Sequence, residues 1–227
     1  MEPVRTSSFP RRGAIIAESL LRSEPSDKQW RTLLHYVAAS VHELLERGAP
    51  PDAGSLVAVG LDVQAGCFVT WRRIAVDGQP QRPGAQLRGC IGAIDPAGRS
   101  LPSLAANMAR SASLRDPRFP PVAAAELDGL RLSVTLLAAP VEWPAPRDPE
   151  ELVLGRDGLE VQRGDQRGVL LPQVALEWGY DAAAFLGATC GKAKLPATAW
   201  QSPDTTVWRF AAWERGANYR DLRATAP

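Results

Sequence analysis

The chain has 227 residues, of which 26 are basic, 25 are acidic and 45% are hydrophobic. This length and apolar content suit one large globular domain or two small ones that share an interface. A formal net charge of +1 gives no overall field that would attract nucleic acid or an anionic lipid surface. We therefore expect neither nucleic acid nor a membrane as a partner.

The three cysteines, Cys67, Cys90 and Cys190, are odd in number and far apart. Their spacing contains no CxxC or metal-knuckle pattern, so we expect no disulfide framework, no metal site and no cofactor. The run 11–17 resembles the start of a signal peptide, but Glu18 interrupts it and no clean cleavage pattern follows. Cysteines without a disulfide framework are typical of proteins in a reducing compartment, and the expected location is cytoplasmic.

The first clear element is a helix that follows a poorly specified arm at 1–25. Ser26 and Gln29 match a capping box, in which each side chain satisfies a free backbone donor of the first turn. Apolar residues then recur at helical spacing until Gly48. This stripe consists of Trp30, Leu33, Leu34, Val37, Ala38, Val41, Leu44 and Leu45.

The same helix carries His35 and His42, the two histidines of the chain. Metal-binding pairs on a helix are usually four residues apart, and these are seven apart with no third histidine. We expect them at the boundary or surface of the helix. A Cys–His nucleophile pair would require one of them to lie over Cys90.

The middle of the chain predicts strands at 56–62 and 67–73, a helix at 101–114 and a strand at 130–136, where apolar residues alternate strictly. The segment 115–121 ends this helix, since it contains three prolines in five residues. Farther on, strands are expected at 152–154 and 159–162, joined by a hairpin turn at Arg156-Asp157-Gly158. One helical run through Val174 and Phe185 and a last strand at 205–213 follow.

A unit of strands followed by a helix therefore occurs twice, at 55–115 and 129–190. This order indicates an α+β fold with a loose internal duplication. No clean βαβ alternation is present, which disfavours a doubly wound nucleotide-binding fold.

The stretch 86–94 contains Cys90 between Gly89 and Gly92, with Arg88 before them. Glycine permits close approach of backbone or ligand, and a thiol beside a guanidinium can be exposed and partly ionised. The same residues also suit a tight turn that crosses a core, and the residues alone leave both interpretations open.

Other polar residues lie near glycines or prolines. If they converge on Cys90, they make a cationic pocket in which Arg88 and Lys192 lower the pKa of the thiol and hold an anionic substrate. Alternatively, Asp116 and Arg118 only pin a tight turn, and Lys192 only caps a helix. The P-loop, GxGxxG, HExxH and GxSxG patterns are all missing from the sequence.

The hexamer Leu87-Arg88-Gly89-Cys90-Ile91-Gly92 resembles the hallmark motif of the AMMECR family. Further segments at 116–120, 134–137, 155–159, 168–175 and 190–195 resemble other parts of the family pattern, although Lys194 stands where the family usually has glycine. The resemblance implies an α+β fold with two pseudo-symmetric strand–helix halves whose strands combine into a barrel-like sheet.

The resemblance covers roughly residues 28–215, and we expect a single domain at 26–215, divided into subdomains at 26–127 and 128–215 and followed by a polar tail at 216–227. The family has no established biochemical activity. Its bacterial and archaeal members are often encoded beside a Memo-like protein and a radical SAM enzyme, which makes those two proteins the expected partners.

Two hypotheses follow for the function. In the first, the chain is an enzyme or an enzyme component that acts on a small anionic substrate in a pocket around the hexamer. In the second, it is a non-catalytic binding or scaffold protein that works with the Memo-like and radical SAM partners. The candidate catalytic residue is Cys90, and the candidate binding residues are Arg88, Gly89, Gly92, Asp116, Arg118 and Lys192.

Overall fold

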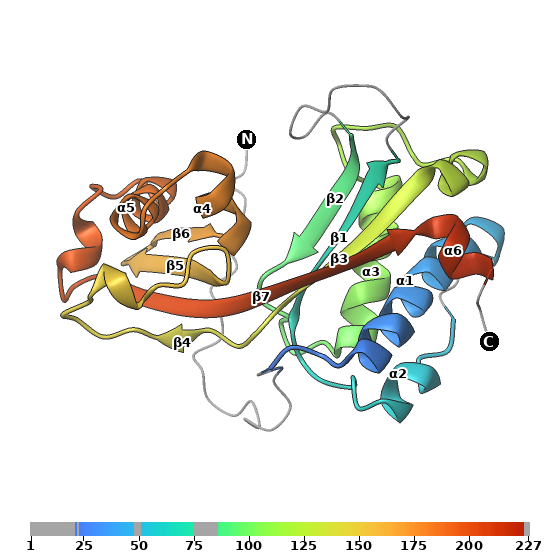
Figure 1. Cartoon of the computed structure of the whole chain (residues 1–227), viewed down its shortest axis with the longest axis horizontal. Helices are drawn as coiled ribbons and strands as arrows, with labels where there is room; N and C mark the ends of the chain where they lie inside the picture. Colours follow the sequence, from blue (N-terminus) through green and yellow to red (C-terminus); the bar gives the residue numbers. More distant parts are fainter. Residues whose placement is uncertain (1–20, 22, 48–50, 75–85, 225–227) are drawn as a thin grey trace.

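The computed structural model describes residues 21, 23–47, 51–74 and 86–224. Helices and strands alternate along this part of the chain, and Figure 1 labels them. The helices are α1 (Asp27–Arg47), α2 (Gly54–Ala58), α3 (Leu101–Leu114), α4 (Pro172–Trp178), α5 (Ala182–Lys192) and α6 (Tyr219–Ala224). The strands are β1 (Gly66–Arg73), β2 (Leu87–Ala93), β3 (Leu130–Leu137), β4 (Val141–Glu142), β5 (Asp157–Arg163), β6 (Gln166–Leu170) and β7 (Thr206–Asn218). Short 3-10 helices are η2 (Ala124–Gly129), η3 (Pro149–Glu151) and η4 (Ala199–Gln201).

The strands form one curled antiparallel sheet, a half-barrel with the order β2-β1-β3-β7-β5-β6. The order is symmetric about the β3–β7 pair. In each half a hairpin (β1–β2 or β5–β6) is followed by helix, and a later strand (β3 or β7) returns to pair with the first strand of that hairpin. The predicted α+β class with two pseudo-symmetric halves is confirmed.

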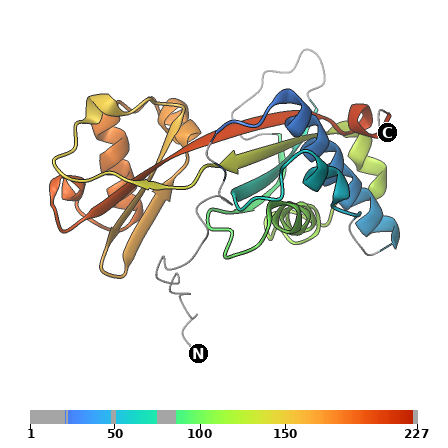
Figure 2. The same ribbon diagram turned by 90° about the horizontal axis from the view of Figure 1, so that it is seen from below.

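The molecule has two lobes (Figures 1 and 2). The first lobe contains α1, α2, α3, α6 and β1–β3, and the second contains α4, α5 and β4–β6. Strand β7 is 13 residues long and belongs to both lobes. Residues 206–211 pair with β5 in the second lobe, and residues 212–218 pair with β3 in the first lobe. Each lobe has its own buried cluster of apolar side chains. Leu130, Leu132, Val134 and Leu136 of β3 lie in the first cluster, although the predicted division between residues 127 and 128 assigned this strand to the second subdomain.

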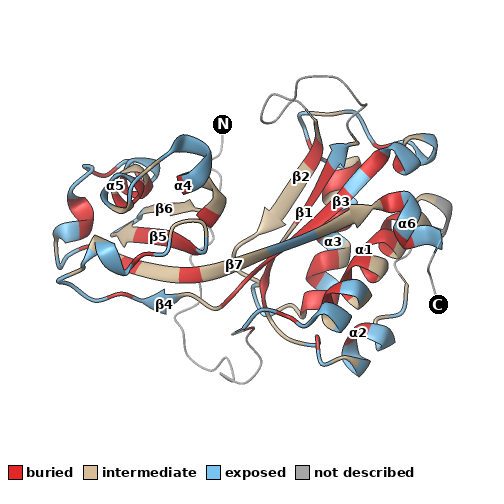
Figure 3. Ribbon diagram, viewed as in Figure 1, coloured by how far each residue is buried: buried red, intermediate tan, exposed pale blue. Residues whose placement is uncertain are grey.

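Alternation along β1 separates two faces of the sheet in the first lobe. Cys67, Val69 and Trp71 are fully buried in the first cluster, on the side of the sheet that α3 covers, and much of β1 is coloured as buried in Figure 3. Thr70 and Arg72 therefore lie on the opposite face, because successive side chains of a strand alternate. We call that opposite face the polar face; it carries Thr70, Arg72, Cys90, Ser133, Thr135 and Glu214.

Helix α1 begins as its capping box predicts. The backbone N–H of Ser26 donates to Oε1 of Gln29 at 2.9 Å, and the N–H of Gln29 donates to the Ser26 hydroxyl at 3.4 Å. The predicted stripe is buried from Trp30 to Val41 and faces the first core.

The strand predicted at 56–62 is wrong, since this segment begins with the helical turn α2. The Asp52 carboxylate accepts a hydrogen bond from the N–H of Gly54 at 2.8 Å, which fixes the start of the turn. Leu56 is the buried residue of that turn. A turn with a single anchor gives no periodicity that distinguishes it from a short strand.

The strand predicted at 152–154 and the hairpin at 156–158 are also wrong. Asp157 and Gly158 lie inside β5, and the hairpin loop is Gly164-Asp165, between the paired residues Arg163 and Gln166. The Asp157 side chain accepts from the N–H of Val153 at 3.0 Å and is ion-paired with Arg156. These local bonds make Asp157 stabilise the bend that leads into β5, and it does not form a two-residue hairpin turn.

The C-terminal region is more ordered than predicted. The helical run divides into α4 and α5, because Gly179 ends α4 with φ +63° and the Asp181 carboxylate accepts from the N–H of Ala184 to begin α5. The expected polar tail continues β7 to Asn218 and then forms α6. Tyr219 and Leu222 of α6 are buried in the first core, and two anchors in a polar segment gave too weak a pattern to predict.

Candidate functional site

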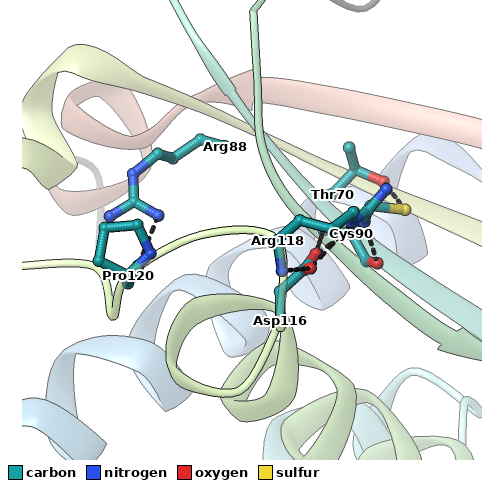
Figure 4. Close-up of polar contacts among 6 residues, drawn as sticks. All are labelled: Thr70, Arg88, Cys90, Asp116, Arg118 and Pro120. Atoms are coloured by element: carbon teal, nitrogen blue, oxygen red, sulfur yellow. Dashed lines mark hydrogen bonds and ion pairs between the residues drawn. The ribbon is translucent and has the colours of Figure 1, made fainter.

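Edge strand β2 places Cys90 on the polar face of the sheet. Cys90 pairs directly with Thr70 of β1, and the next residue, Ile91, packs on the opposite face against the first core. The Thr70 hydroxyl donates to the Cys90 sulfur at 3.2 Å (Figure 4). Thr70 is buried and Cys90 is half-buried, so the thiol is held by a neighbour while its surface stays partly accessible.

Asp116 and Arg118 cover the open edge of β2 beside Cys90. The Asp116 carboxylate accepts from the N–H of Cys90 at 2.8 Å, and the Arg118 guanidinium donates to the Cys90 carbonyl at 3.0 Å. Two further bonds, of 2.9 and 2.7 Å, join the guanidinium to the carboxylate (Figure 4). The Asp116–Arg118 ion pair thus satisfies the outward-facing N–H and carbonyl groups of Cys90, which have no neighbouring strand at this edge.

The Asp116–Arg118 pair is strongly polarised. Hydrogen bonds from the Arg118 side chain, and then from the N–H groups of Cys90 and Arg118, hold the pKa of the buried Asp116 carboxyl well below its usual range. The pKa of Arg118 is raised, first by its hydrogen bond to Asp116 and also by attraction to Cys90. Arg118 is therefore a charged group held at the backbone carbonyl of Cys90.

Arg88 points away from Cys90 (Figure 4). The β1–β2 register passes from Gly89 to Leu87, so Arg88 is the extra residue of a β-bulge, a feature that redirects a side chain. Its guanidinium, 3% exposed, donates to both carboxylate oxygens of Glu126 and to the carbonyl oxygens of Pro120 and Pro121. These bonds tie β2 to the segment after α3 and to η2.

The two glycines around Cys90 make room for different neighbours. A Cβ on Gly89 would lie 2.1 Å from the carbonyl oxygen of Ala112, so this glycine lets α3 approach the strand. A Cβ on Gly92 would lie 2.1 Å from the ring of Phe68, so that ring lies over Gly92 on the polar face. Both glycines leave the surroundings of Cys90 closely packed.

Lys192, predicted to join this site, is the last residue of α5 and is exposed in the second lobe. Helix α5 covers β5 and β6, whereas Cys90 lies on β2 of the first lobe (Figure 1). The structure therefore brings Cys90, Asp116 and Arg118 together and places Lys192 in another part of the molecule. Its predicted binding role stays a prediction.

The other two cysteines are buried and free. Burial raises the pKa of Cys67 to about 12, and burial also raises the pKa of Cys190. They behave as small core residues, whereas Cys90 is half-buried and hydrogen-bonded on the polar face.

Both histidines line a hollow of about 680 Å³ between α1, α2 and α6. Helix α1 packs on the face of the sheet opposite Cys90, so neither His35 nor His42 lies over the thiol. Both are half-buried, as predicted for the margin of the helix.

Within the described ranges, no group of three or more His, Cys, Asp or Glu side chains could hold a metal ion. No described helix is long and apolar enough to cross a bilayer.

Two partners in this region, Thr70 and Glu126, were not predicted from the sequence. The alternation at 67–73 contained a usable signal for Thr70, since it separates this residue from the buried Cys67 and Val69. The contact with Cys90 depends on the register between β1 and β2, which the sequence does not specify.

Comparison with known proteins agrees with this architecture. The model of the AMMECR1 family matches residues 34–214. A protein of Thermococcus kodakarensis is 45% identical over 149 residues, covering 65% of this chain and 70% of its own length. A protein of Pyrococcus furiosus is 37% identical over 188 residues, covering 82% and 87%. The crystal structure of an uncharacterised protein from Pyrococcus horikoshii matches with a TM-score of 0.71 and 35% identity, covering 86% of this chain and 94% of that one. The chain belongs to the AMMECR1 family.

Proposed function

We propose that this protein is an enzyme, or a component of one, that binds a small anionic substrate beside Cys90 on the polar face and uses the thiolate as its nucleophile. The observation that carries the proposal is the half-buried Cys90 sulfur, which accepts a hydrogen bond from Thr70 while Arg118 is held at its backbone. The hydroxyl and the guanidinium are both donors that can bind an anion at this position.

The predicted binding residues contribute unequally to this proposal. Arg118 is the anion-binding group, and Asp116 positions it and fixes the strand edge. Gly89 and Gly92 shape the strand on either side of the sulfur. Arg88 acts through Glu126 and the proline carbonyls as a positioning residue, and the proposal does not depend on Lys192.

Alkylation by iodoacetamide, followed peptide by peptide with mass spectrometry between pH 5 and 9, tests the proposal in the folded protein. We expect Cys90 to react at pH 7 faster than a free cysteine peptide, whose thiol has a pKa near ~8.5. Cys67 and Cys190 are internal controls that should react only after unfolding. Thr70→Val should slow Cys90, because the hydroxyl donor is lost while the shape is kept. If the alkylation rate of Cys90 depends on pH as that of the free peptide does, or if Cys90 is labelled only in denaturant, the proposal that it is a nucleophile is wrong.

A second candidate is a non-catalytic binding protein that works with Memo-like and radical SAM proteins in the cytoplasm. The exposed surface of α4 favours a protein partner, since Trp178 is 70% exposed, Leu176 is 65% exposed and the Trp178 ring stacks on Tyr180. Co-purification of each partner with wild type and Trp178→Ala tests this idea, and Val141→Ala on β4 is the matched exposed apolar control. Retention of neither partner by the wild-type chain argues against it.

A further inference from the structure

A row of small side chains crosses the polar face from Cys90. Cys90 pairs with Thr70, Thr70 with Ser133, and Ser133 with Gly216, so the row runs over β2, β1, β3 and β7. Same-face neighbours on a strand are two residues apart, roughly 7 Å along it. The flanking rows carry larger side chains: Phe68, Thr135 and Glu214 on one side, and Arg72, Arg131 and Asn218 on the other.

The floor of this row contains an unused hydroxyl. Ser133 is 3% exposed, and its hydroxyl makes no hydrogen bond within the described residues, yet it is not one of their fully buried polar atoms. Solvent therefore reaches this hydroxyl, and a ligand that replaces the solvent can hydrogen-bond it. Thr70, its neighbour in the row, already donates to the Cys90 sulfur. Ser133 is therefore available to a bound molecule.

An ion pair spans the row above Thr70 and Ser133. Arg72 and Glu214 belong to opposite flanking rows and lie two strands apart, yet their side chains meet at 3.5 Å. Thr135 also donates to the Glu214 carboxylate, at 3.3 Å. The side chains of Arg72 and Glu214 are 44% and 41% exposed. Exposed pairs of this kind contribute little to stability, so an incoming anion can compete for the arginine.

We propose that Arg72 is an anion-binding residue of the Cys90 site and that Glu214 occupies it until the ligand arrives. The ligand is a small oxyanion, a carboxylate or a phosphate, that displaces Glu214 from the guanidinium. Its body then lies over Thr70 and hydrogen-bonds the Ser133 hydroxyl, with its other end at Cys90. The inference rests on the proposed function, because it gives the substrate class and a binding residue for that same site.

Alkylation by a charged and a neutral reagent isolates the effect of Arg72. The rate at which iodoacetate labels Cys90, divided by the rate for iodoacetamide, cancels any change in thiol reactivity. We expect Arg72→Gln to lower this ratio about threefold, as for one charge roughly 7 Å away in water-like surroundings. Glu214→Gln should raise it, because it frees Arg72. Arg73→Gln is the matched control, since this neighbour on β1 makes the same charge change from the other face.

Calorimetric titration of the Cys90→Ala protein with inorganic pyrophosphate provides a measurement that needs no reactive thiol. We expect saturable binding that weakens at least threefold in the background Arg72→Gln, tightens in Glu214→Gln and weakens in Ser133→Ala. An effect on iodoacetate alone indicates a carboxylate ligand, and an effect on pyrophosphate indicates a phosphate.

The two proposals fail in different ways. If Cys90 is inert but pyrophosphate binding depends on Arg72 and Glu214, the nucleophile is wrong and the anion site stands. If neither the reagent ratio nor pyrophosphate binding responds to Arg72→Gln and Glu214→Gln, the anion site is overturned, whatever the reactivity of Cys90.

Discussion

The two halves of the sheet carry nearly the same tripeptide on their outer strands. Strand β2 contains Arg88-Gly89-Cys90, and strand β6 contains Arg167-Gly168-Val169. Gly89 pairs with Trp71 as Gly168 pairs with Val161, and each glycine lies against a later helix of its own half, Gly89 against α3 and Gly168 against the end of α5. The shared arginine and glycine therefore belong to the repeated fold rather than to one reaction.

The halves differ at the residue after the glycine. Cys90 pairs with Thr70, whereas Val169 pairs with Glu160, which is ion-paired with Arg167. In the first half Asp116 and Arg118 bind the strand edge at Cys90. Arg88 and Gly89 of the hexamer therefore maintain packing, whereas Cys90 and the side chains around it are the groups that could bind or react with a substrate.

The largest effect is expected from adding a methyl group at either equivalent glycine. A Cβ would lie 2.1 Å from a backbone atom of α3 in Gly89→Ala and 2.4 Å from the backbone N of Ala193 in Gly168→Ala. Neither atom can move without its helix, so each change should lower the free energy of unfolding by about 3 kcal/mol. Urea denaturation measures this. Gly191→Ala is the control, since no atom lies within 4 Å of its added Cβ. If Gly168→Ala lowers the free energy of unfolding much less than Gly89→Ala does, the two glycines are not equivalent.

The arginines should differ in importance although their positions correspond. Arg88→Met should cost about 2–3 kcal/mol, because a guanidinium with a 3% exposed side chain loses a carboxylate and two carbonyl partners. Arg167→Met should cost about 1 kcal/mol, since this arginine is 28% exposed. Chemical denaturation of both variants gives the comparison, and equal losses would contradict it.

Acid should release the strand edge in the first half. The pKa of Asp116 is lowered in the folded protein, so its contribution is complete above the unfolded value of about 4 and is lost as the pH falls through the folded value. Asp116→Asn should cost about 2 kcal/mol at pH 7 and flatten the loss of stability between pH 5 and 2. Glu126, whose pKa Arg88 lowers, adds a dependence of the same sign. Urea midpoints across this range provide the test, with the exposed Asp204→Asn as control. An unchanged slope in Asp116→Asn would sink the prediction.

The smallest effect on stability is expected from making the first half resemble the second. Cys90→Val places at β2 the residue found at the equivalent point of β6, and it replaces the thiol by two methyl groups at a half-buried position. Its free energy of unfolding should stay within about 1 kcal/mol of wild type, while thiol labelling at this position disappears. A larger loss would mean that the sulfur contact with Thr70 matters for folding, and Cys90→Ser then distinguishes the hydrogen bond from the packing.

Much of the fold was predictable because its determinants are local or periodic. The capping box at Ser26 marks where a helix begins, and the stripe from Trp30 to Val41 and the alternation at 130–136 each report burial on one face of one element. The duplicated order of strands and helix gave the α+β class. The errors at 56–62, 152–158 and 216–224 fall where one or two anchors or a local side-chain bond decide the backbone, which leaves no repeating pattern.

The sequence by itself determined that Cys90 lies between two glycines beside an arginine, and it identified the AMMECR family by that hexamer. Only the tertiary structure decided what these neighbours do, because strand register and a β-bulge set which face each side chain occupies. They turn Arg88 toward Glu126, bring Thr70 and Arg118 to Cys90, and leave Lys192 in the other lobe. Contacts between residues twenty or more positions apart depend on how elements pair, and no local pattern contains that information.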